Sequence, residues 1–101
     1  MKNTNHIESL WKEHLATPFP DRCRGEEAGG VDLVMLDADI AGCVSTYIGN
    51  NGSLDAHRFQ ILQDLQLDAQ RVVGLLEDSS EQEYYTRLGR LAHLVLAECT
   101  G

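Results

Sequence analysis

The sequence predicts an all-α protein, a small antiparallel bundle of about four helices, and three observations support this prediction. Apolar residues recur at helical spacing in four separate segments. Stretches rich in Gly, Pro, Asn and Ser separate these segments. The chain of 101 residues, 43% of them hydrophobic, has the size and composition of one globular domain with one core. We therefore interpret residues 1–101 as a single helical domain.

The first helix is predicted over residues 5–16. Its apolar stripe consists of Ile7, Leu10, Trp11, His14 and Leu15. Pro18 ends it, because proline cannot continue a helix. A long Pro/Gly loop is expected over residues 17–30, closing with Gly29 and Gly30. Loops this long inside a small domain are usually functional or disordered, so the loop is a candidate region for a site.

The second helix is predicted over residues 31–48, and its first part is ambiguous. Residues 31–36 form a short apolar run that is also typical of a buried strand. The helical interpretation is favoured because apolar residues continue at helical spacing: Leu33, Leu36, Ile40, Val44 and Tyr47. Whether residues 31–36 are strand or helix stays open at this point.

Two longer helices are predicted over residues 54–77 and 80–99. Each has an apolar seam that alternates steps of three and four, namely Leu62, Leu65, Ala69, Val72 and Leu76, then Tyr85, Leu88, Ala92, Val95 and Cys99. Ser79 and Ser80, followed three residues later by Gln82 and Glu83, resemble a capping box at the start of the last helix. Helices joined by so short a connection pack antiparallel.

The composition excludes several classes of function. Sixteen acidic against eight basic residues give a formal net charge of −8, which repels nucleic-acid phosphates and anionic membrane surfaces. No apolar run approaches the ~20 residues that cross a bilayer. Residues 1–14 lack the apolar core of a signal peptide, so we expect a cytoplasmic protein. Three widely spaced cysteines are typical of reduced thiols, and we expect no metal and no cofactor.

Asp37 is the first candidate functional residue, because a helical wheel places it among the apolar residues of the second helix. A buried carboxylate needs a partner, so Asp37 is expected to accept a hydrogen bond inside the fold. The alternative is a metal-dependent enzyme or binder built from Asp37, Asp39 and His57, the last at the start of the third helix. We assign no catalytic residue, and we consider a binding function the better interpretation.

Cys23 is the second candidate, because it lies between Arg22 and Arg24 in the predicted loop. Neighbouring positive charge in an exposed loop lowers a thiol pKa and makes the thiol more reactive. This pattern predicts a thiol sensor as another alternative function. The four histidines lack the spacing of helical zinc sites, and we interpret them as surface or boundary residues.

The favoured hypothesis is a small acidic protein–protein interaction module, acting as an accessory, regulatory or inhibitory subunit. Trp11, Phe19 and Tyr84 are its candidate partner-binding anchors, because aromatic residues dominate interface energetics. Residues 25–57 contain six acidic residues and no Lys or Arg, which favours a basic protein partner. Self-association into a homo-oligomer is the other expectation for these apolar faces.

Overall fold

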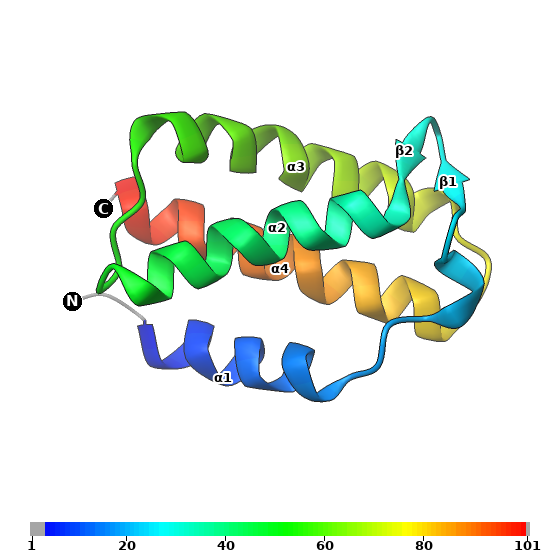
Figure 1. Ribbon diagram of the computed structural model, residues 1–101, viewed down its shortest axis with the longest axis horizontal. Helices are drawn as coiled ribbons and strands as arrows, with labels where there is room; N and C mark the ends of the chain where they lie inside the picture. The colour runs from blue at the N-terminus through cyan, green and yellow to red at the C-terminus, as the bar shows by residue number, and fades with distance from the viewer. Residues whose placement is uncertain (1–3, 101) are drawn as a thin grey trace.

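The computed structural model describes residues 4–100, with the side chains of residues 6–99. Within this range four helices pack together beside a small two-stranded hairpin (Figure 1). The helices are α1 (Thr4–Ala16), α2 (Leu33–Gly49), α3 (Ala56–Leu75) and α4 (Ser79–Thr100). The predicted all-α bundle is therefore confirmed, with the hairpin as an addition that the sequence did not predict. None of the helices in this range has an apolar stretch that could cross a membrane.

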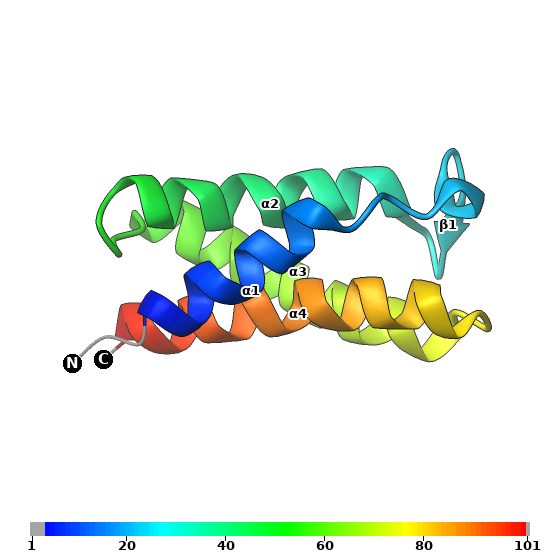
Figure 2. The same cartoon turned by 90° about the horizontal axis from the view of Figure 1, so that it is seen from below.

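Successive helices run in opposite directions, and α4 contacts all three others. The most extensive contact joins α3 and α4, as expected for two long helices with a short connection. Helix α1 lies across the seam between α2 and α4, on the side opposite α3 (Figures 1 and 2). This central position explains why α4 supplies many fully buried side chains, among them Tyr85, Leu88, Leu91, Ala92 and Val95.

Helix α1 is attached to the core through Ile7, which is fully buried, and through His14, which is 5% exposed. The prediction that Leu15 belongs to the apolar stripe is wrong, because this side chain is 66% exposed. Adjacent residues on a helix point about 100° apart. The bundle therefore buries His14 and leaves Leu15 in solvent near the end of the helix.

The segment between α1 and α2 is more ordered than the predicted loop. It contains a 3₁₀ turn, η1 (Asp21–Cys23), and the antiparallel strands β1 (Glu27–Ala28) and β2 (Val31–Asp32). Gly29 and Gly30 connect the strands with φ values of 58° and 81°. Two positive φ values are what a type I′ hairpin turn requires, and glycine adopts them without strain. Residues 31–36 are thus two strand residues followed by the start of α2.

Each of the last three helices begins after an aspartate that caps it: Asp32, Asp55 and Asp78. In each case a carboxylate oxygen accepts a hydrogen bond from the backbone N–H three residues on, at 3.0, 2.9 and 3.1 Å. The predicted capping box at Ser79 and Ser80 was therefore placed one residue late. Aspartate competes well for this role because its short side chain reaches the free N–H groups of the first turn. Helix α3 begins and ends two residues inside its predicted bounds.

Candidate functional site

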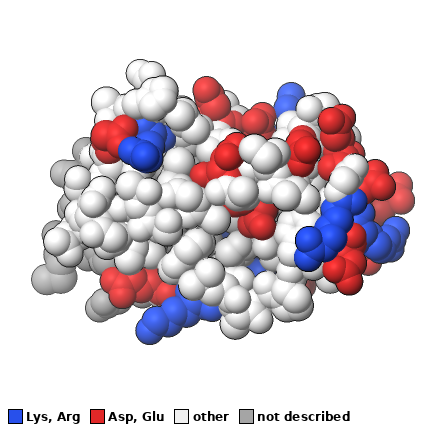
Figure 3. Space-filling view, viewed as in Figure 1, with Lys and Arg blue, Asp and Glu red and all other residues white. Residues whose placement is uncertain are grey.

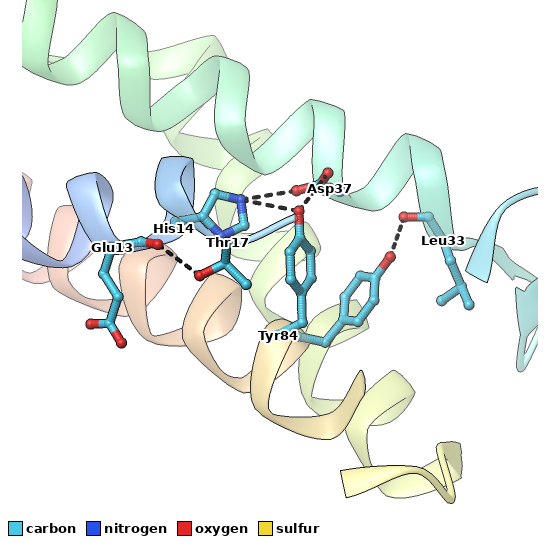
Figure 4. A network of polar contacts seen from close by, with 7 residues as sticks. Glu13, His14, Thr17, Leu33, Asp37 and Tyr84 are labelled. Carbon is cyan, nitrogen blue, oxygen red and sulfur yellow. Dashed lines mark hydrogen bonds and ion pairs between the residues drawn. The ribbon is translucent and has the colours of Figure 1, made fainter. Parts of the chain in front are cut away.

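A cluster of polar side chains joins three helices where α1, α2 and α4 meet (Figure 4). His14 Nε2 lies 3.1 Å from Asp37 Oδ1. The Tyr84 hydroxyl donates a hydrogen bond to Asp37 Oδ2 at 3.1 Å and lies 3.5 Å from His14 Nε2. Because a carboxylate only accepts hydrogen bonds, His14 Nε2 must carry a proton in this arrangement. Asp37 thus accepts one hydrogen bond from each of two other helices.

The polar cluster that connects these three helices is largely buried. His14 and Tyr84 are 5% and 4% exposed, whereas the Asp37 side chain is 21% exposed. Burial raises the pKa of the Tyr84 phenol, and the negative charge of Asp37 raises it further. Tyr84 therefore remains a hydrogen-bond donor across the physiological pH range. The expectation that Asp37 accepts a hydrogen bond inside the fold is confirmed, although its partners are a histidine and a tyrosine.

Of the three predicted aromatic anchors, Tyr84 belongs to this cluster, and Trp11 and Phe19 pack against it. Trp11 stacks on the His14 ring with centroids 5.8 Å apart, and Phe19 meets the Tyr84 ring edge-on at 5.6 Å. Trp11 and Phe19 are half-buried. Tyr84 packs inside the protein, so it is not a surface anchor open to a partner. These contacts fix α1 and the start of the following segment against α4.

His14 was interpreted from the sequence as a surface or boundary residue and was not predicted as part of a site. The signal was its place in the apolar stripe of the first helix, one turn beyond Trp11. His14 Nδ1 is buried and has no hydrogen-bond partner among residues 4–100. With the ring covered by Trp11 and Tyr84, the histidine serves as a packed donor rather than as a group open to a substrate.

Asp39 and His57 lie on the surface, away from the buried cluster. Asp39 faces a hollow of about 390 Å³ between α2 and α3 that Cys43 and Arg58 also line. His57 is exposed in the first turn of α3. Across residues 4–100, no group of three or more His, Cys, Asp or Glu side chains is arranged to hold a metal ion. The structure thus gives no support to the predicted metal-dependent alternative.

The prediction that Cys23 is exposed and has a lowered thiol pKa is wrong. The Cys23 side chain is 1% exposed, and burial together with the charge of Glu81 raises the pKa of its thiol. The physical reason is the η1 turn, which directs the neighbouring Arg22 and Arg24 outward and the thiol inward; these arginine side chains are 82% and 65% exposed. The thiol-sensor alternative therefore loses its main support.

Native Cys23 and Cys43 are both expected to react slowly with iodoacetamide, because only thiolates attack and both thiols are buried. Burial also raises the pKa of Cys43. Mass spectrometry of peptides from protein labelled in buffer and in urea measures the two rates. Rapid labelling of Cys23 in the native protein would contradict its buried position.

An open groove between α3 and α4 is the second candidate site. Its central hollow has a volume of about 440 Å³ and is lined by Gln66, Ala69, Gln70, Val73, Tyr85, Thr86, Gly89, Arg90 and His93. A hollow of about 380 Å³ continues it past Gln66 and His93 toward Ala97. We call these two hollows together the α3/α4 groove, because all of their lining residues belong to α3 and α4. A third hollow of about 510 Å³ adjoins the groove at Val73, Thr86 and Arg90 and lies mainly between α1 and α4, where Leu10, Glu13, Glu83 and Arg87 also line it.

Small residues where the two helices meet account for this groove. A Cβ atom placed on Gly89 would lie 3.5 Å from the Ala69 Cβ, which is ordinary van der Waals contact. Because Ala69 and Gly89 have little or no side chain, they leave a depression where the two helices meet. Gln66 and Gln70 border this depression. At one end the groove passes half-buried Phe59 and Leu67, whose side chain is 64% exposed. The result is an apolar floor bordered by polar groups.

The charge of this groove differs from that of the whole protein. No Asp or Glu lines its central hollow or the hollow toward Ala97, although the chain has sixteen acidic residues. Glu13 and Glu83 line only the adjoining hollow between α1 and α4. On the face shown in Figure 3, in contrast, acidic side chains are spread widely and the basic ones lie close to them.

Comparison of this chain with protein-family models, curated proteins and solved structures found no match.

Proposed function

We propose that this protein is a small acidic protein–protein interaction module, which binds a helix of a partner protein in the α3/α4 groove. The observation that supports this proposal is the groove itself, with its apolar floor, polar rim and exposed Leu67. Protein interfaces have the same organisation, in which an apolar centre is surrounded by polar groups. An accessory, regulatory or inhibitory subunit works through a surface of this kind.

The dimensions of the groove favour a helix as the bound element. Along α4 it extends from Tyr85 to Ala97, which corresponds to ~18 Å, or about three helical turns. Two antiparallel helices leave a furrow in which a third helix packs its side chains between theirs. Helix-in-groove binding of this type uses apolar anchors at every third or fourth position.

A catalytic function has less support from the described residues. The cluster of His14, Asp37 and Tyr84 is engaged in holding three helices together, with two of its three members almost fully buried.

As part of the same proposal we place the protein in the cytoplasm, because its three cysteines are free thiols and such thiols persist in a reducing compartment.

A displayed library of amphipathic helices tests this proposal. Helices selected on the folded wild-type protein are expected to lose at least about tenfold in affinity for Thr86→Trp, because an indole at this exposed rim position would fill the groove. Gln60→Trp is the matched control, since Gln60 is exposed on α3 and does not line the groove. Fluorescence anisotropy measures the affinities. Failure to select any helix that distinguishes the two variants would overturn the proposal.

A further inference from the structure

We infer that the helix bound in the α3/α4 groove is an acidic amphipathic helix, and that one of its carboxylates pairs with Arg90. This inference rests on the proposed function of the groove and names the kind of partner. It differs from the expectation drawn from net charge, which favours a basic partner. The local charges of the groove support the opposite sign.

Arg90 is exceptional among the arginines of this protein. Five of the six have a carboxylate of the chain within 4.0 Å: Arg22 with Glu81, Arg24 with Asp21, Arg58 with Asp55, Arg71 with Asp68 and Arg87 with Glu13. Arg90 is exposed and forms no ion pair with any residue of the range 4–100. The chain has twice as many acidic as basic residues, yet Arg90 has no carboxylate partner within residues 4–100. This arginine lines the central hollow of the groove.

The surroundings of Arg90 favour an acidic occupant over a basic one. A basic helix would meet the positive charge of Arg90 and would find no carboxylate in either hollow of the groove. Glu13 and Glu83 line only the adjoining hollow that Arg90 also borders, and Glu13 is already paired there with Arg87. An acidic side chain could pair with the guanidinium, and the rim groups Gln66 and Gln70 can donate further hydrogen bonds. Local charge decides this preference, because salt screens exposed charges beyond ~10 Å at 0.1 M ionic strength.

The same charges favour a different protein over a second copy of this chain as the occupant. A two-fold interface places the same patch of both copies face to face. Centred on the two hollows without carboxylates, such an interface would bring two Arg90 side chains together with no acid between them. A different protein, with an acidic flank on an amphipathic helix, supplies the missing charge.

The test repeats the helix selection on wild-type protein and on Arg90→Glu. Helices selected on the wild type are expected to carry Asp or Glu beside their apolar face and to bind Arg90→Glu about tenfold or more weakly. Selection on Arg90→Glu is expected to yield Lys or Arg at the same positions. Lys12→Glu is the matched control, because it changes the net charge equally at an exposed position of α1 outside the groove.

The outcomes separate this inference from the proposed function. Helices that are sensitive to Thr86→Trp but show no acidic preference, or lose as much affinity on Lys12→Glu, would overturn the acidic partner and leave the groove as a binding site. The absence of any helix sensitive to Thr86→Trp would overturn the groove itself. Sedimentation of the wild type covers the remaining case, since a dimer that Thr86→Trp dissociates would show that a second copy fills the groove.

Discussion

Replacing Asp37 by Ala is expected to lower the free energy of unfolding by about 3 kcal/mol, because it leaves two buried partners without their acceptor. The Tyr84 hydroxyl and His14 Nε2 each direct a proton at this carboxylate, and both side chains are almost fully buried. Truncating one member of such a network costs the desolvation of the groups left behind. Urea unfolding followed by circular dichroism measures the loss.

The matched controls are Asp32, which caps α2, and Asp39, which lies within α2. Asp32→Ala is expected to cost about 1 kcal/mol, since Asp32 caps α2 through the Met35 N–H. Asp39→Ala is expected to change stability by no more than about 0.5 kcal/mol, because Asp39 is exposed. Equal small losses for all three variants would contradict the buried role of Asp37.

Replacing Ile7 by Ala is expected to lower the free energy of unfolding by about 3 kcal/mol, as is typical when a buried aliphatic side chain is removed from a packed core. Ile7 is fully buried and belongs to the same cluster of apolar residues as the central residues of α4. Thermal and urea unfolding, monitored by circular dichroism, provide the measurement.

Leu15→Ala is the matched control for Ile7→Ala, because Leu15 lies on the same helix and is 66% exposed. Its effect is expected to stay within about 0.5 kcal/mol. If Ile7→Ala also had so small an effect, α1 would not belong to the cooperatively folded bundle. Hydrogen exchange would then show α1 opening separately from the other helices.

The helical bundle could be predicted because each helix buries a wide apolar face, and such faces repeat at 3.6 residues. The hairpin could not, because its strands have only two residues each and show no alternation. Gly29 and Gly30 gave the signal for its turn, yet without flanking strands they indicated only a break in the chain. Short elements of this kind depend on contacts with the rest of the fold.

The candidate sites show a similar division. The unusual position of Asp37 was visible on a helical wheel, whereas its partners are 23 and 47 residues away in sequence. Cys23 was misjudged because charges adjacent in sequence point away from it in the η1 turn. The α3/α4 groove escaped prediction because its rim consists of polar residues typical of any solvated helix face. The unpaired state of Arg90 emerges only from distances in the folded protein.

Mapping of amide chemical shifts by NMR, with a selected helix added to the labelled wild-type protein, tests the proposed groove most directly. The largest shifts are predicted at Gln66, Gln70, Thr86 and Arg90, which line the central hollow. The outer face of α2, including exposed Val34 and Met35, is predicted to stay unchanged. Shifts concentrated on α2 or the hairpin, with the α3/α4 groove unaffected, would contradict the proposal that this protein binds its partner there.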